Sequence, residues 1–402
     1  MFDPFGGPFL DDPYPQFAGF VDSQPVFWSD DLGYWVVSRY GDARRVLRDY
    51  ETFSAVNALA PITPPCQAAG QALAAGGFRS IPTLTNVDPP AHTRTRRIAQ
   101  LAFSPRRVAQ MEEFVRGLVR RFIDDRLHDG RAEIVAALTW ELPALVIFDI
   151  LGVPPEDVAA VKQGSANRLL FMFGRTSESE QVEIATGMAS FWGYCEALAE
   201  DRRANPREDF TSDLVHTPDR DGRPLTQQEV PTILFGLLLA GHETTTNILG
   251  NALRRLLEHR RSWEEICADQ ALIPNAVEEV LRFDSSVIHW RRRTVVPVEL
   301  SGVPIPADAN VLVSIGAANR DPRVFARPDD FDIHRANAHD HLSFGSGPHL
   351  CLGASLARLE ARVVLEELSA ALPGLRLSRG QEFEFMPIIA FRGPRSLHVE
   401  WG

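Results

Sequence analysis

The sequence lacks features that would place it in several common classes of protein. It has no CxxC pair and no cysteine cluster, which excludes a disulfide framework and a cysteine zinc site and fits a reducing cytoplasm. Its longest apolar run, residues 232–241, is well short of the ~20 residues that span a bilayer, so we expect no membrane anchor. The cysteines are Cys66, Cys195, Cys267 and Cys351.

The sequence also has fewer basic residues than acidic ones. Lysine and arginine number 41 against 53 aspartates and glutamates, and the net charge is −12. This charge would repel a nucleic-acid backbone, so we expect no nucleic-acid partner. The first residues have neither a basic segment nor an apolar run before small residues, so we expect no signal peptide.

What is present is typical of one globular protein with a sizeable core, because 45% of the 402 residues are hydrophobic and 23% are charged. No repeat or Ser/Gly linker divides the chain. Helices are predicted to begin at Asp88 and Ser104, each followed by proline, and to cover 356–372, whereas 57–88 has the composition of a long loop. We predict a mainly α fold with small β-sheets. Strand-like segments are 25–29, 34–38, 296–314 and 375–400.

The longest predicted helix begins at a capping box and covers about residues 226–260. Its first half is apolar almost all round, but six polar residues in a row follow from His242. The hydroxyl of Thr244 can bond the carbonyl of Ala240 and open the helix next to Gly241, which would make a notch for a small ligand or water. The alternative is that the helix reaches the surface and its polar residues are solvated.

A glycine-rich loop with one cysteine, residues 344–353, precedes the helix at 356–372. The helix N-terminus would lower the pKa of the Cys351 thiol, and the glycines would let backbone amides approach its sulfur. A lone cysteine is otherwise most often a small buried hydrophobe. The loop has the spacing FxxGxxxCxG, through Phe344, Gly347, Cys351 and Gly353.

This spacing is that of the haem-binding loop of the cytochrome P450 superfamily, which the chain resembles from about Phe2 to its end. Ala240–Thr244 resembles the family's oxygen-activation helix, and Glu279–Arg282 resembles its ExxR helix. The resemblance implies a single haem domain over residues 1–402, with the triangular helical prism of cytochrome P450 around a buried haem b. The chain looks most similar to haem domains that are fused to a phthalate-dioxygenase-type reductase.

The resemblance also implies roles for particular residues. Cys351 would ligate the haem iron, because a thiolate ligand favours O–O cleavage. Glu243 and Thr244 resemble the acid and hydroxyl that supply protons during oxygen activation. Glu279 and Arg282 would form a structural pair that a later group such as Arg335 joins, although a solvated pair is the default for such spacing.

The haem propionates need cations or donors, and the resemblance supplies candidates. His92 and Arg96 are four apart on one helical face, and His349 lies in the cysteine loop. A further contact falls among Arg291, Arg292 and Arg293, with Arg292 the expected one. The remaining predicted haem contacts are Ala240, Gly241, Phe344, Cys351 and Gly353.

The resemblance implies a haem-thiolate monooxygenase that uses O2 for hydroxylation or oxidative dealkylation. No charged anchor stands out in the implied pocket, so a small or medium hydrophobic substrate is expected, including an aromatic one. The alternatives are a peroxide-driven peroxygenase, which Glu243 and Thr244 disfavour, and a non-enzymatic haem ligand sensor. The expected pocket residues are Leu238, Val287, Ile288, Ile388 and Ile389.

An electron donor is also implied, either a separate ferredoxin or a reductase. Arginines without a carboxylate follow Asp88, and more follow Cys351, in segments that border the proximal haem face in the family. An acidic ferredoxin would be steered there. The alternative is that Arg96 serves a propionate and the others are merely solvated. The arginines are Arg94, Arg96, Arg97, Arg106, Arg107, Arg358 and Arg362.

Overall fold

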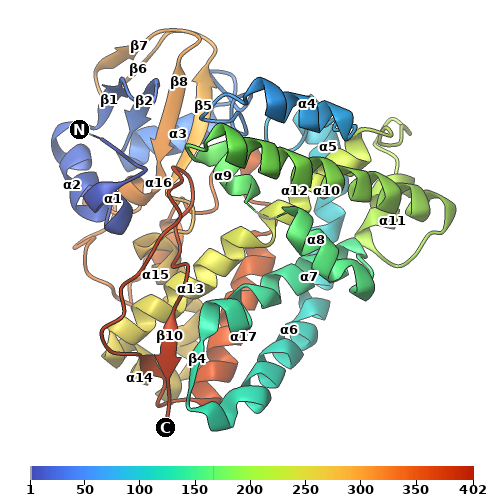
Figure 1. The fold of residues 1–402 in the computed structure, drawn as a ribbon. Coiled ribbons are helices and arrows are strands. Elements are labelled where there is room, and N and C mark those ends of the chain that lie inside the picture. The colour runs from blue at the N-terminus through green and yellow to red at the C-terminus, as the bar shows by residue number, and fades with distance from the viewer. Residues whose placement is uncertain (1, 166) are drawn as a thin grey trace.

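Helices form most of the chain in a computed structural model, which describes residues 2–165 and 167–402. Figure 1 shows the largest sheet at one corner, with the long helices filling the rest of the molecule. The predicted mainly α class with small sheets is confirmed. Within the described residues, no helix is long and apolar enough to cross a membrane.

The largest sheet has five strands in the order β1-β2-β8-β5-β3. The β1–β2 hairpin is antiparallel, and β2 runs parallel to β8 with Trp35 opposite Val311. The other sheets have the order β4-β10-β9 and the pair β6-β7. The strands are β1 (Val26–Ser29), β2 (Tyr34–Val37), β3 (Phe53–Ser54), β4 (Arg131–Glu133), β5 (His289–Thr294), β6 (Val298–Leu300), β7 (Val303–Ile305), β8 (Asn310–Ser314), β9 (Arg376–Leu377) and β10 (His398–Glu400).

All the predicted strand segments contain strands, but β3, β4 and β5 were not predicted. The missed strand β5 is central to its sheet, and it has the sequence HWRRRT, whose arginines hide the apolar alternation of a half-buried strand. Arg291 and Arg292 are nevertheless buried there.

One group of helices precedes the central helix in the chain, and a second group comprises the central helix and the helices after it. The first group is α1 (Gly7–Asp11), α2 (Tyr14–Ser23), α3 (Tyr40–Arg48), α4 (Gln67–Ala75), α5 (Ala91–Ala99), α6 (Pro105–Arg126), α7 (Glu141–Leu151), α8 (Val158–Ser165), α9 (Arg168–Phe173), α10 (Glu178–Ala204) and α11 (Phe210–His216). The second group is α12 (Glu229–Ala240), α13 (Glu243–Glu258), α14 (Arg260–Ala268), α15 (Ile273–Phe283), α16 (Ile315–Ala318) and α17 (Ala354–Ala371).

The predicted helix boundaries are partly correct. Helix α6 follows Ser104, and α17 lies within two residues of the predicted 356–372. The start at Asp88 is wrong: α5 begins at Ala91, and the Asp88 carboxylate instead accepts hydrogen bonds from the Ser54 hydroxyl and the Ala55 amide. The loop at 57–88 contains α4.

The long central helix is interrupted where its sequence turns polar. Helix α12 ends at Ala240 and α13 begins at Glu243, so the prediction of one continuous helix is wrong. The predicted opening is confirmed, because Thr244 Oγ1 donates to the Ala240 carbonyl at 2.7 Å. A Cβ at Gly241 would lie 2.7 Å from Ile147 Cγ1, so only glycine lets the break pack against α7.

Candidate functional site

The cysteine loop is held in one shape by its own backbone. The Cys351 amide donates to the Phe344 carbonyl at 2.8 Å, and Leu350 donates to Gly347 at 3.1 Å. Gly347 has a φ of +75°, and a Cβ there would lie 2.8 Å from the Arg48 Cα. This turn needs glycine both for its left-handed backbone and for its close approach to α3.

Cys351 lies just ahead of α17, and its side chain is accessible. Protein nevertheless surrounds the sulfur, and this burial raises the pKa of the thiol, against the opposing effects of the Gly353 amide, Arg96 and Arg358. The expectation of a lowered thiol pKa is therefore wrong for the protein alone. An accessible but deep thiol opens onto an internal space rather than onto bulk water.

The central helix borders an internal space as well. Gly236 and Ala240 are exposed and Thr244 is half-buried, although their neighbours Phe235 and Leu237 are buried in the core. These three residues are four apart and so share one face of the interrupted helix. A Cβ at Gly236 would meet nothing within 4 Å, so that end of the face is open.

Glu243 and Thr244 lie together at the start of α13. Burial raises the pKa of Glu243 to about 7, and Arg168 acts in the opposite direction. Within the part of the chain that the structure describes, Glu243 Oε2 has no hydrogen-bond partner. A carboxyl with this pKa can both hold and release a proton near neutral pH.

Three basic side chains converge beside the cysteine loop. The His92 and His349 rings have centroids 4.3 Å apart, and Arg292 acts electrostatically on both. Burial is the main cause that lowers the pKa of His92 to about 4, of His349 to about 3 and of Arg292 to about 10. Neither ring nitrogen of His92 has a partner among the described residues. These orphaned donors fit an anionic carboxylate.

The three consecutive arginines of β5 have different surroundings. Arg291 donates to the carbonyls of Ala58 and Ala60, and Arg293 pairs with Asp308 at 2.7 Å. Only Arg292 joins the histidine cluster, so it keeps its place as the expected propionate contact. Arg96 donates to the Leu350 carbonyl, one residue before Cys351.

The residues present therefore fit haem b. They offer one accessible thiol, an open helix face at Ala240 and buried donors for propionates. No group of three or more potential metal ligands is found in the described part of the chain, and haem iron needs only one ligand from the protein. The Phe344 carbonyl accepts a hydrogen bond from the Cys351 amide, Gly353 immediately precedes α17, and Gly241 lies in the break between α12 and α13.

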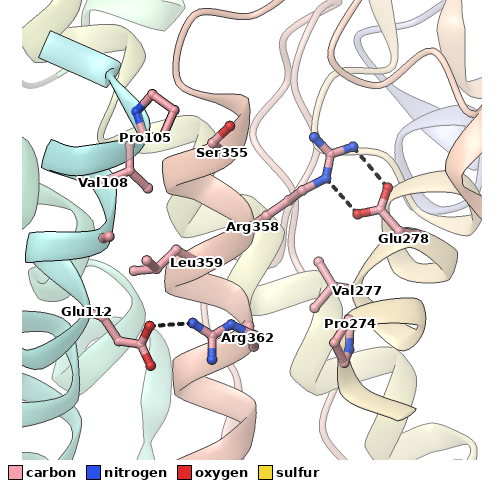
Figure 2. A pocket seen from close by; sticks show the side chains of 11 residues that line it. Pro105, Val108, Glu112, Pro274, Val277, Glu278, Ser355, Arg358, Leu359 and Arg362 are labelled. Atoms are coloured by element: carbon pink, nitrogen blue, oxygen red, sulfur yellow. Dashed lines mark hydrogen bonds and ion pairs between the residues drawn. The ribbon is translucent and has the colours of Figure 1, made fainter. Parts of the chain in front are cut away.

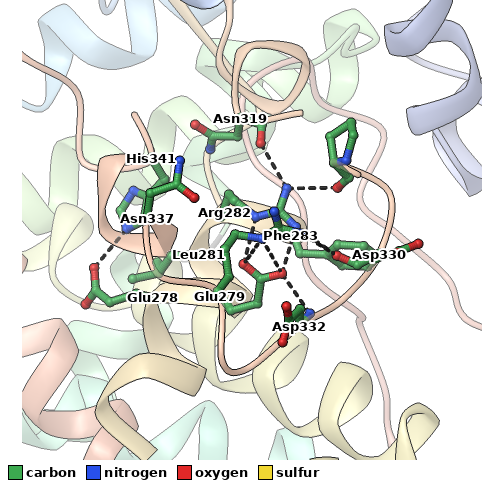
Figure 3. A network of polar contacts seen from close by, with 12 residues as sticks. Glu278, Glu279, Leu281, Arg282, Phe283, Asn319, Asp330, Asp332, Asn337 and His341 are labelled. Atoms are coloured by element: carbon green, nitrogen blue, oxygen red, sulfur yellow. Dashed lines mark hydrogen bonds and ion pairs between the residues drawn. The ribbon is translucent and has the colours of Figure 1, made fainter. Parts of the chain in front are cut away.

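The ExxR residues form a buried network rather than a solvated pair (Figure 3). Arg282 Nε and Nη2 each donate to Glu279 at 2.7 Å, and both side chains are 0% exposed. Arg335 Nε completes the network at 3.1 Å from Glu279, as expected. Arg282 also donates to the Asn319 carbonyl at 3.1 Å, and the Asn319 amide group bonds Leu342 and Ser343. The network thus reaches the residues that lead into the cysteine loop.

The expected pocket residues come from different parts of the fold. Leu238 is buried in the helical core, about 200° around α12 from Gly236, so it does not share that face. Ile288 packs against Gly316. Ile388 and Ile389 pair with the end of α9, where Ile389 donates to the Phe173 carbonyl at 3.0 Å. Val287 pairs with Phe391 nearby.

Two residues that border this space were not predicted. Gly236 could have been found, because it lies four residues before Ala240 on the same helical face. Arg168 on α9 could not, because its burial depends on packing against α12.

The arginines that were expected to attract a donor are mostly neutralised. Figure 2 shows a surface pocket of about 390 Å³ between α6, α15 and α17, where Arg358 bonds Glu278 and Arg362 bonds Glu112 at 2.7 Å. The expectation of an unpaired basic surface is therefore wrong in part. Arg94 pairs with Glu229 and Asp219, and Arg107 pairs with Asp213. Arg97 and Arg106 are exposed, and no ion pair to a described residue is found for either.

Such a site fits a haem protein with a cysteine ligand, and comparison with known proteins identifies the same class. Residues 193–368 match the cytochrome P450 family. The chain is 37% identical, over 98% of its length and 92% of the relative's, to the cytochrome P450 monooxygenase PikC of Streptomyces venezuelae. It therefore belongs to the cytochrome P450 family, whose cofactor is haem b, and it is a cytochrome P450 monooxygenase.

Solved structures give the same result. An intact type IV self-sufficient cytochrome P450 monooxygenase superposes with a TM-score of 0.96 and 41% identity, and all of this chain covers 52% of that protein. Cytochrome P450 CREJ in complex with (4-ethylphenyl) dihydrogen phosphate also superposes with a TM-score of 0.96, at 36% identity over 100% of this chain and 99% of that one. The expected cytochrome P450 fold and the likeness to self-sufficient members are confirmed.

The buried network around Glu279 generates a stability prediction. Glu279→Gln leaves the buried Arg282 and Arg335 without a counter-charge, so we expect the free energy of unfolding to fall by about 3–5 kcal/mol. Chemical denaturation of the holoenzyme measures it. The control is Glu264→Gln on α14, whose partner Arg260 is 41% exposed and can be solvated. An equal loss in both variants would contradict a special role for Glu279.

Proposed function

We propose that the chain is a haem-thiolate monooxygenase that inserts one oxygen atom from O2 into a small or medium hydrophobic substrate. The reaction would be a hydroxylation or an oxidative dealkylation, with Cys351 as the iron ligand. The observation that carries the proposal is the accessible thiol of Cys351 deep in the protein, together with Glu243 and Thr244 on an open helix face. The complex of CREJ with an aryl phosphate supports an aromatic substrate.

The residues around the internal space would bind the haem and orient it. Bound haem with a thiolate ligand supplies the activation of O2. Cys351 is held in place by its loop, and His92, Arg96, Arg292 and His349 would bind the propionates. The propionates would then be the anionic partners of the buried hydrogen-bond donors in this cluster, which have no such partner in the protein.

Proton supply would be the task of Glu243 and Thr244. With its pKa raised to about 7 by burial, Glu243 is mostly protonated below neutral pH and can pass that proton on. Thr244 Oγ1, bonded to the Ala240 carbonyl, lies where the helix opens. The hydroxyl can therefore act between the carboxyl and oxygen in the internal space.

Electrons would come from a ferredoxin or a reductase that docks near Arg97 and Arg106, the exposed arginines of the segment from Asp88 to Glu112. The likeness to self-sufficient relatives supports a reductase as the donor. The dispersed free cysteines support a cytoplasmic location.

The cysteine assignment is tested by Cys351→Ser. We expect the thiolate-type absorption of the reduced carbonyl complex to disappear, because serine cannot supply the sulfur ligand. Cys267→Ser, in a half-buried position on α14, is the control and should keep the spectrum. Survival of the spectrum in Cys351→Ser, with its loss in another cysteine variant, would overturn the assignment.

The proton route is tested by Thr244→Ala. We expect substrate binding to persist while the product formed per electron falls by about tenfold or more, with the electrons appearing in peroxide or water. Product and peroxide are measured against donor oxidation. Thr246→Ala is the matched control for Thr244→Ala. The Thr246 hydroxyl makes the same kind of bond, to the His242 carbonyl at 3.2 Å, but Thr246 is buried. Unchanged coupling in Thr244→Ala would remove the pair from the reaction.

Donor docking is tested by Arg97→Glu and Arg106→Glu. Each should slow reduction by an acidic ferredoxin by about fivefold at low salt and flatten its salt dependence, because one attraction becomes a repulsion. Stopped-flow reduction measures the rate, and Arg261→Glu on α14 is an exposed control. Wild-type rates in both variants at every salt concentration would place docking elsewhere.

A further inference from the structure

Arg168 is a buried cation that the proposed reaction does not use. It begins α9, is 1% exposed and donates from Nη2 to the Phe235 carbonyl of α12 at 2.8 Å. Its other nitrogens, Nε and Nη1, have no hydrogen-bond partner among the described residues. The guanidinium lies 3.8 Å from the centroid of the Phe235 ring and 5.1 Å from that of Phe191.

Other fully buried arginines of the chain have partners that Arg168 lacks. Arg202 pairs with Asp209 and Asp201, Arg282 pairs with Glu279, and both terminal nitrogens of Arg291 reach carbonyls. Arg292 resembles Arg168, and its missing counter-charge is explained by a haem propionate. Aromatic rings offset only part of the cost of an unpaired buried charge, so the two unpaired nitrogens of Arg168 leave room for an anionic ligand.

Burial does not remove the charge of Arg168. It lowers the pKa of this guanidinium to about 10, so the group stays cationic at neutral pH. The acidic groups that act on it are Cys195, whose thiol pKa burial raises far above its usual range, and Glu243, whose carboxyl is mostly protonated below pH 7. The Cys195 thiol therefore stays neutral, and Glu243, which is partly ionised near pH 7, offsets only part of the charge of Arg168.

Arg168 contacts Phe235, on the part of α12 next to the open helix face. Phe235, which accepts its hydrogen bond, immediately precedes Gly236, and Gly236 shares that face with Ala240 and Thr244. Eight residues separate Gly236 from Thr244, which is about 12 Å at 1.5 Å per residue. The far end of α9 pairs with Ile388 and Ile389, so the helix also borders the proposed apolar pocket.

We propose that Arg168 binds an anionic oxygen group of the substrate, a carboxylate or a phosphate monoester, while the apolar body of the substrate extends along the open face toward Thr244. The inference rests on the proposed function and names its substrate class. It replaces the expectation that the pocket has no charged anchor. Nε and Nη1 are covered by protein, so binding would require neighbouring side chains to move aside.

Matched ligands on the holoenzyme test this proposal. The shift of the haem spectrum gives dissociation constants for 4-ethylbenzoate against 4-ethylbenzamide, and for 4-ethylphenyl phosphate against 4-ethylphenol. Wild type should bind at least one anion about tenfold or more tightly than its neutral counterpart, and the pair that shows the preference identifies the group. Arg168→Gln should abolish the preference and leave binding of the neutral ligands unchanged.

Controls separate recognition from folding. Arg175→Gln removes an exposed arginine that follows α9 and should keep the preference, and Arg168→Lys should keep part of it. If Arg168→Gln does not take up haem, Arg168→Met is used in its place, because it removes the same charge. No preference in wild type, or the same preference in the neutral variants, overturns the proposal.

The outcome also separates this proposal from the proposed function. Neutral ligands that shift the haem spectrum without any preference for the anions would overturn only the role of Arg168. A holoenzyme without the thiolate-type carbonyl spectrum would overturn the proposed function itself.

Discussion

The buried carboxylate of Glu279 holds together the part of the structure on which the cysteine loop depends. It accepts hydrogen bonds from Arg282, Arg335 and the Asp332 amide, so helix α15 and the segment after α16 are fixed to one point. From Arg282 the contacts continue to Asn319 and on to Leu342 and Ser343, which precede the loop. Because both charges of the pair are fully buried, neither partner can be exchanged for water without a large loss of stability.

A different principle governs the buried cations around the internal space. Arg292, beside two neutral histidines, and Arg168 carry charge without a direct ion pair to a described acidic side chain. A protein stabilises such groups poorly by itself. They therefore indicate where anionic groups of ligands belong, at the propionates in one case and at the substrate in the other. The Glu279 network stabilises the fold, whereas these cations prepare it for ligands.

The sequence predicted the parts of the site that are local in the chain. The cysteine loop, the polar residues of the interrupted helix and the ExxR pair each lie within about ten residues, so side-chain types and spacing were sufficient. Contacts between distant segments could not be predicted. Arg358 is neutralised by Glu278, 80 residues away, and Arg168 is buried by contact with Phe235, 67 residues away.

Strand β5 shows the same limit in the fold. Arginines are normally exposed, but Arg291 and Arg292 are buried in a strand that pairs with β8, and Arg291 also donates to carbonyls of the 57–88 segment. The break of the central helix was only half predicted, because the hydroxyl bond of Thr244 is local but the need for Gly241 comes from Ile147 on α7.

The central claim is that the site transfers oxygen from O2 to a substrate. The most direct measurement supplies isotopically labelled O2 to the reduced holoenzyme with a substrate that shifts the haem spectrum, and determines the label in the product by mass spectrometry. The account predicts one labelled oxygen atom in each product molecule and none when only the water is labelled. Product without label, or equal turnover with peroxide in the absence of O2 and donor, would contradict it.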